Sequence, residues 1–173
     1  MSDDFEHARD AFAAWARGQR GLEVEDIVRR PELDGGGFFG FTAVGPGRPV
    51  RGLAGHDRVL SYRDPDAFAA WLAAVDFAHA QDADPVQLVH VYRSLQPPPD
   101  SRYAEDSFPL LYEQQLATAP AGDTAALPRL EADGDGRRVD VWFQCEPGSR
   151  LERWSFRVGP DNGFTIERGV VSE

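Results

Sequence analysis

The chain has no lysine, a single cysteine and no long apolar run. All eighteen basic residues among its 173 are arginine. The one thiol, Cys145, cannot form a disulfide within the chain, so the fold is expected to suit a reducing compartment. The longest apolar stretch, Ala67 to Val75, is far shorter than the roughly 20 residues of a membrane helix, and no basic segment precedes an apolar one as in a secretion signal. We therefore expect a cytoplasmic protein that does not enter a membrane.

Positive charge is also scarce, because 29 acidic residues outnumber the 18 arginines and give a net charge of −11. This balance argues against nucleic acid as a partner, since phosphate binding depends on clustered Lys and Arg, and it disfavours an anionic membrane surface. The excess lies between Asp64 and Gly136, where thirteen acids stand against three arginines. Such a block is either a solvated face or a docking surface for a basic partner.

Capping residues and apolar spacing predict helices. Acids at the start and apolar residues at helical spacing indicate a helix from Asp3 to Arg17. A cap, a proline and an i, i+3, i+4, i+7 apolar pattern indicate another from Asp64 to Ala80. Ser107 is expected to cap a third helix that reaches Leu116, and the ambiguous segment from Leu22 to Arg30 is assigned to a short helix.

Strands are predicted where β-branched and aromatic residues gather between turn residues. Phe38 to Val44 and Arg58 to Arg63 fit this pattern, with the Gly/Pro-rich segment Gly45 to Gly55 as a loop between them. Val86 to Leu95 has apolar residues on both faces, which is typical of a central strand covered on both sides. The glycines from Gly35 to Gly37 are interpreted as a turn into the first of these strands.

The C-terminal quarter, residues 127 to 171, predicts an antiparallel meander whose register three turns define independently. The first turn opposes Leu130 to Val139, Glu131 to Arg138 and Arg129 to Asp140. The second opposes Val141 to Trp154, Val139 to Phe156, Phe143 to Glu152 and, on the other face, Trp142 to Arg153. The third opposes Val158 to Phe164 and Phe156 to Ile166. This register gathers the apolar side chains on one face, which must be covered, and leaves Trp142 partly exposed on the other.

The fold class that follows is α+β, with residues 1–173 as a single domain. We expect a mainly antiparallel sheet that ends in the C-terminal four-strand meander, with about three helices packed on one face. The order of helix first and meander last resembles, in architecture, the nuclear-transport-factor-like cone folds, in which sheet and helices enclose a cavity.

Motifs for metal, cofactor or catalysis are each better explained structurally. Gly35, Gly37 and Gly40 match G-x-G-x-x-G, but a strand follows where a dinucleotide site needs a helix. The acids from Glu131 to Gly136 lack the bidentate Glu of a calcium loop and fit a hairpin turn.

The candidate catalytic residues are equally isolated in the sequence. Cys145 is next to an acid that would raise its thiol pKa, and the four histidines share no metal-ligand spacing. His56 and Asp57 are the best remaining acid–base pair. No metal, cofactor or catalytic residue is therefore assigned.

Two functional hypotheses follow. The first is a non-catalytic acidic module that binds a basic protein partner, in the manner of immunity proteins or secretion chaperones, with Asp82, Asp84, Glu105 and Asp106 as the binding residues. The second is a pocket protein or small enzyme with a cone-like fold, in which Phe12, Trp15, Trp71 or Phe77 would line a cavity for a small molecule.

Overall fold

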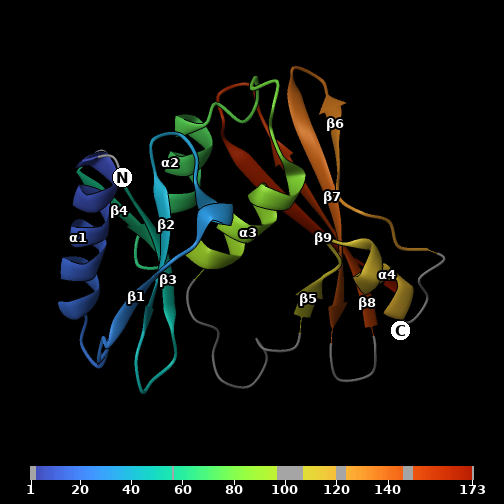
Figure 1. Ribbon diagram of the computed structural model, residues 1–173. Coiled ribbons are helices and arrows are strands. Elements are labelled where there is room, and N and C mark those ends of the chain that lie inside the picture. The colour runs from blue at the N-terminus through green and yellow to red at the C-terminus, as the bar shows by residue number, and fades with distance from the viewer. Residues whose placement is uncertain (1–2, 56, 97–106, 120–123, 146–149, 173) are drawn as a thin grey trace. The chain divides into compact units, whose positions relative to one another are not determined.

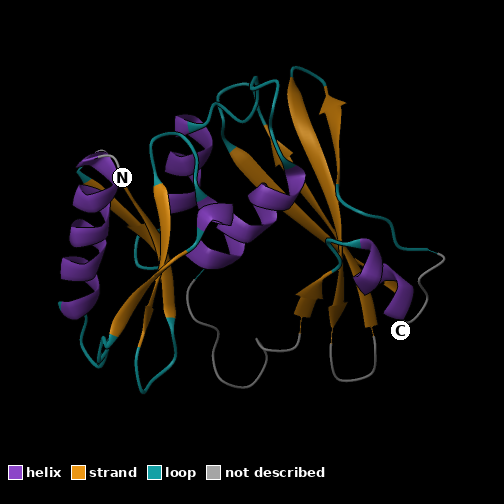
Figure 2. Cartoon of the chain, viewed as in Figure 1, coloured by secondary structure: helices purple, strands orange, loops and turns teal. Residues whose placement is uncertain are grey.

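The computed structural model describes residues 3–55, 57–96, 107–119, 124–145 and 150–172. It has an α+β fold with two antiparallel sheets, one of four strands and one of five (Figure 1, Figure 2). The chain divides into an N-terminal unit, Met1–Val75 with His90–Pro97, and a C-terminal unit, Asp76–Val89 with Pro98–Glu173. No helix in the described ranges is long and apolar enough to cross a membrane.

The N-terminal unit is a four-stranded sheet in the order β1-β2-β3-β4 with α1 on one face and α2 on the other (Figure 1). Its elements are α1 (Asp3–Arg17), β1 (Asp26–Arg29), the 3-10 helix η1 (Pro31–Leu33), β2 (Phe39–Val44), β3 (Val50–Gly55), β4 (Arg58–Ser61), α2 (Ala67–Ala74) and the second half of α3 (Pro85–Leu95). The predicted first helix and the strand at Phe38 to Val44 are thereby confirmed. The predicted helix from Asp64 to Ala80 is shorter, because α2 ends at Ala74.

Packing of α1 on the sheet creates the core of this unit. Phe12 is fully buried and stacks on Phe41 of β2, with ring centroids 5.4 Å apart. Ala8 and Ala16 are buried on the same side of the helix, at the spacing that places them on one face with Phe12. Small residues on either side of Phe12 let the helix approach the sheet closely.

The expected loop from Gly45 to Gly55 is wrong, because Val50–Gly55 forms β3. The glycines of β3 allow neighbouring segments to approach the strand backbone closely, and they do not form a turn. A Cβ on Gly52 would lie 2.7 Å from the Leu60 carbonyl oxygen and 2.9 Å from the Phe12 ring. Gly52 lets α1 and β4 pack against the strand, and a Cβ on Gly55 would lie 2.1 Å from the Gly37 carbonyl oxygen.

The short helix expected from Leu22 to Arg30 is also wrong. Residues Asp26–Arg29 form β1, which pairs antiparallel with β2, and their burial alternates with a period of two. The local sequence pattern of this segment fits either a helix or a strand. Pairing with the edge of β2 satisfies its backbone hydrogen-bonding groups and so favours the strand.

The predicted central strand from Val86 to Leu95 is a helix, α3. Asp84 caps it, since its side chain accepts a 2.8 Å hydrogen bond from the Val86 backbone N–H, and Pro85 occupies the first helical position. Leu88, Val91, Tyr92 and Leu95 recur at helical spacing and are buried. These apolar residues occupy one face of a helix and not the two faces of a strand.

The C-terminal unit contains the meander and confirms every predicted cross-strand pair. Its strands are β5 (Ser107–Pro109), β6 (Arg129–Asp133), β7 (Gly136–Cys145), β8 (Arg150–Val158) and β9 (Phe164–Ser172). The first turn is two residues long, because Asp133 pairs with Gly136 in the same register. Buried residues of the predicted inner face are Val139, Val141, Phe143, Trp154, Phe156 and Val158.

The mismatched pair of Phe143 with Glu152 has a local explanation. The Trp154 indole Nε1 donates a 2.9 Å hydrogen bond to Glu152, two residues away on the same side of β8. The ring of Trp154 stacks on Phe143 with centroids 4.1 Å apart, and the Arg168 guanidinium lies 3.8 Å from the Trp154 ring centroid. Trp142, on the outer face, is half-buried as expected.

The helix predicted to begin at Ser107 is corrected as well. Ser107–Pro109 forms β5, which pairs with the end of β7, and the helix α4 (Glu113–Thr118) begins six residues later. Pro109 ends the strand, and the Gln115 side chain accepts a 3.0 Å hydrogen bond from the Tyr112 backbone N–H at the helix start.

Replacing Gly52 with alanine should lower the free energy of unfolding by about 1–3 kcal/mol, because the new methyl group overlaps a strand backbone and the Phe12 ring. Gly47→Ala is the matched control, since no atom lies within 4 Å of a Cβ built there, and its effect should stay within about 0.5 kcal/mol. Urea unfolding of both variants measures this. Equal stabilities would contradict the close packing of α1 on β3.

The expectation of a single domain can be tested with the same variant. In one cooperative domain, Gly52→Ala should reduce the hydrogen-exchange protection of the slowest amides in β7 and β8 as much as that of the slowest amides in β2 and β3. Mass-spectrometric hydrogen exchange of wild type and variant measures both. Loss of protection confined to β2 and β3 would establish two independently folding units.

Candidate functional site

Negative charge is concentrated in the C-terminal unit. That unit has 17 acidic residues and 8 arginines, a net charge of −9, whereas the N-terminal unit has 12 and 10, a net charge of −2. The division covers all 173 residues, so the two values account for the total of −11. A search for an acidic surface therefore begins on the five-stranded sheet.

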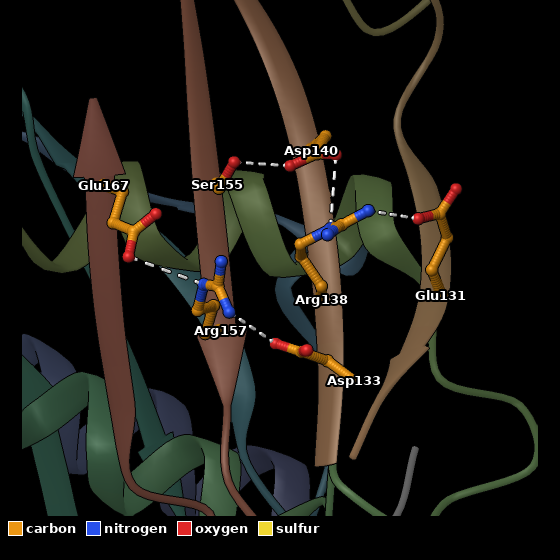
Figure 3. Close-up of polar contacts among 7 residues, drawn as sticks. All are labelled: Glu131, Asp133, Arg138, Asp140, Ser155, Arg157 and Glu167. Carbon is orange, nitrogen blue, oxygen red and sulfur yellow. Dashed lines mark hydrogen bonds and ion pairs between the residues drawn. The ribbon is translucent and has the colours of Figure 1, made fainter. Parts of the chain in front are cut away.

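The outer face of this sheet carries a ladder of paired charges (Figure 3). Arg138 on β7 donates a 2.5 Å hydrogen bond to Glu131 on β6 and lies 3.3 Å from Asp140. Asp140 in turn accepts a 2.5 Å hydrogen bond from Ser155 on β8. The hydrogen bond with Glu131, followed by the charge of Asp140, raises the pKa of the Arg138 guanidinium above its ordinary value.

A second series of contacts runs beside the first (Figure 3). Arg157 on β8 donates a 3.0 Å hydrogen bond to Asp133 on β6 and lies 3.6 Å from Glu167 on β9. The two series link four adjacent strands through alternating charge. Because their acids are already paired with arginines, this ladder serves strand pairing better than it serves a charged partner.

Carboxylates that gather at one end of the sheet are a better candidate. The β6–β7 and β8–β9 turns lie at the same end (Figure 1), where a Cβ on Gly136 would lie 3.1 Å from Gly159. Asp133 is the last residue of β6, Asp135 belongs to the first turn, and Asp161 belongs to the second. We call this end, with the carboxylates of Asp76, Asp133, Asp135 and Asp161, the acidic turn end.

Asp76 joins the acidic turn end through Asn162. Asn162 has a φ of 60° and donates a 3.1 Å hydrogen bond to Asp76, while its own side-chain oxygen accepts a 2.9 Å bond from the Ala78 backbone N–H. His79 lies 2.7 Å from the same carboxylate. Hydrogen bonds from His79 and Asn162, aided by the charge of Arg137, lower the pKa of Asp76 and keep it ionised.

A shallow hollow lies on the outer face of the same sheet. It has a volume of about 200 Å³ and is lined by Arg153, Ser155, Glu167, Arg168, Gly169, Val170 and Val171. Ligand pockets typically have volumes of roughly 300 Å³ or more, so this hollow suits at most a small polar group.

The four predicted binding residues have different outcomes. Asp82 is exposed, and Asp84 is the exposed residue that caps α3. Glu105 and Asp106 lie outside the described residues. Asp76, Asp133 and Asp135 belong to the acidic block that the sequence indicated, whereas Asp161 was missed, although Asp161-Asn162-Gly163 is a typical turn sequence.

The other chemical candidates are accounted for within the described ranges. Cys145 is a buried thiol at the end of β7. Asp57 lies 3.0 Å from His7, with both side chains exposed, and His56 lies outside the described residues. Gly35 and Phe38 bridge across the predicted turn, and no group of three or more metal-ligating side chains occurs in the part of the chain that the structure describes.

The chain matches no protein-family model, no curated protein and no solved structure.

The charge ladder predicts a measurable coupling between Asp133 and Arg157. A double-mutant cycle with Asp133→Asn and Arg157→Gln should give about 0.2–1 kcal/mol, the usual range for a partly exposed pair, and should weaken as salt is added. Asp135→Asn is the matched control, since it removes the same charge from the same hairpin without removing this contact. Urea unfolding measures the coupling of Arg157→Gln with Asp133→Asn and, as the control cycle, with Asp135→Asn. Equal coupling energies in the two cycles would show that only the general charge matters.

Proposed function

We propose that the protein is a non-catalytic interaction module that binds a basic protein partner through its acidic turn end. The observation that supports this proposal is the gathering of four carboxylates from three segments of the chain at one end of the five-stranded sheet, in the unit that has a net charge of −9. Immunity proteins and secretion chaperones are examples of acidic modules of this class.

The arrangement at the turn end suits electrostatic steering. Asp135 and Asp161 are exposed, and the Asp76 side chain is 58% exposed, so their charges face solvent. Arg157 offsets Asp133, and Arg137 lies close enough to Asp76 to lower its pKa, so four acids stand against two arginines. A surplus of fixed negative charge raises the rate of encounter with a positively charged protein.

Asp76 is followed in the chain by two further exposed acids, Asp82 and Asp84. Asp82 and Asp84, together with Glu105 and Asp106, therefore stay in the proposal as additional binding residues.

The aromatic residues give less support to the alternative, a small-molecule pocket. Phe12, Trp71 and Phe77 are fully buried. Phe12 stacks on Phe41, and Trp71 stacks on Phe68 with centroids 6.1 Å apart. These two rings pack against other rings, as core residues do.

The proposal predicts a salt-dependent association rate. Proteins retained by the tagged chain from native lysate identify a basic partner, and association of the purified partner is then measured against ionic strength. The triple variant Asp76→Asn, Asp135→Asn and Asp161→Asn should slow association about tenfold at low salt, with the rates converging at high salt. The quadruple variant of Asp82, Asp84, Glu105 and Asp106 with Asn or Gln should act in the same direction.

A charge-matched control separates local from general effects. Asp4→Asn, Asp10→Asn and Glu23→Gln remove three exposed charges from the N-terminal unit. This control should retain most of the wild-type rate. Equal rates for control and triple variants, or rates independent of salt, would refute the proposal, and retention of a small molecule instead of a protein would favour a pocket.

A further inference from the structure

The second face of the four-stranded sheet presents a cluster of arginines. Val28 on β1, Thr42 on β2 and Arg51 on β3 lie directly opposite one another across the three strands. The neighbouring residues Phe41 and Ala43 belong to the core under α1, so this row points to the opposite face. Arg51 and Thr42 therefore share one side of the sheet, away from α1.

The helix η1 brings Arg30 and Glu32 to the same face. Arg30 follows β1, and its backbone N–H donates a 2.9 Å hydrogen bond to the Gly40 carbonyl oxygen. A Cβ on Gly40 would lie 2.4 Å from the Leu33 side chain, so only glycine lets η1 lie so close to β2. The Glu32 carboxylate accepts a 2.6 Å hydrogen bond from Arg30 Nε and lies 2.5 Å from Arg30 Nη2 in an ion pair.

The second half of α3 adds His90 and Arg93. Tyr92, between them, packs edge to face on Phe68 of α2, with ring centroids 5.2 Å apart. Burial, followed by the charge of Arg51, lowers the pKa of Arg93. Burial, followed by the charge of Arg30 against an opposing effect of Glu32, lowers the pKa of Arg51. The charge of Arg51 is thus repelled by Arg30 and acts repulsively on Arg93, while the Glu32 carboxylate attracts Arg51.

Two polar side chains in this cluster, Thr42 and Arg51, form no hydrogen bond or ion pair in the part of the chain that the structure describes. Thr42 is only 5% exposed, and its hydroxyl oxygen has no hydrogen-bond partner among the described residues. Arg51, directly opposite, forms no hydrogen bond or ion pair within the described ranges, and its side chain reaches solvent. A buried hydroxyl without a partner beside repelling cations is unfavourable for folding alone, which indicates a binding role.

We propose that Thr42, Arg30, Arg51 and Arg93 form a binding site for the phosphate group of a small soluble molecule. Guanidinium groups bind phosphate oxygens in pairs, and the Thr42 hydroxyl donates one further hydrogen bond. Together these side chains offer more donors than the two oxygens of a carboxylate accept, whereas a phosphate has three oxygens free to accept them. The charge of −11 opposes a polyanion such as nucleic acid, which favours a single phosphate group.

Inorganic phosphate is the probe that tests this site, with chloride at equal ionic strength as the reference. Phosphate should raise the melting temperature with a saturable concentration dependence, and isothermal titration calorimetry should give one site per chain. A phosphorylated sugar should bind at least as tightly. Stabilisation by chloride equal to that by phosphate, or binding only to vesicles that contain phosphoinositide, would overturn the proposal.

Variants locate the site. Arg51→Gln should weaken phosphate binding about tenfold or more, and Thr42→Val should weaken it severalfold without lowering the stability of the free protein, since the hydroxyl has no described partner to lose. Arg20→Gln, an exposed arginine outside the cluster, is the control and should bind like wild type. Equal affinity of the Arg51→Gln and Arg20→Gln variants would refute the assignment, whatever the partner of the acidic turn end.

Discussion

The C-terminal unit depends on the pairing of β7 with its neighbours. This ten-residue strand pairs with β5, β6 and β8, so it fixes the register of the sheet on both of its edges. Its alternate residues lie on opposite faces of the sheet. The odd-numbered Val139, Val141 and Phe143 are in the core, and the even-numbered Arg138 and Asp140 are in the charge ladder. A shift of one residue would bury the charged set and expose the apolar set, which makes any other register costly.

The same constraint distributes the charges. Three strand acids contact an arginine of the same sheet, since Glu131 and Asp140 contact Arg138 and Asp133 contacts Arg157. Turn residues have no cross-strand partner, and the side chains of Asp135 and Asp161 are exposed to solvent. Strand pairing neutralises the face of the sheet and leaves the acidity at its turns, which is where a partner could use it.

Elements with their own turn or capping signals were predictable from sequence. The meander register followed from three turns, and the first helix followed from its acids and apolar spacing. α3 was missed, although Asp84-Pro85 is the same combination of cap and proline as Asp64-Pro65, because apolar residues on both sides of the segment also fit a buried strand.

Elements whose sequence reflects distant packing were not predictable. The glycines of β3 have the composition of a loop, and the close approach of Phe12 and Leu60 to Gly52 and of Gly37 to Gly55 explains them. The acidic turn end was predictable only in part. The sequence shows the acidic residues, but it does not show that a hydrogen bond from Asn162 brings Asp76 to them. The arginine cluster was not predictable from sequence. Arg30 lies just before η1, and Thr42, Arg51 and Arg93 come from β2, β3 and α3, which are far apart in the chain.

A local cluster of positive charge is compatible with an acidic protein because screening limits the range of charge. At physiological ionic strength the Debye length is about 8 Å, so a bound anion responds mainly to the groups that contact it or lie one side chain away. Arg30 and Arg93 each interact electrostatically with Arg51, and Glu32 acts on Arg51 with the opposite sign. The net charge of −11 therefore opposes a long polyanion more than it opposes a single phosphate group that contacts Arg51 and its neighbours.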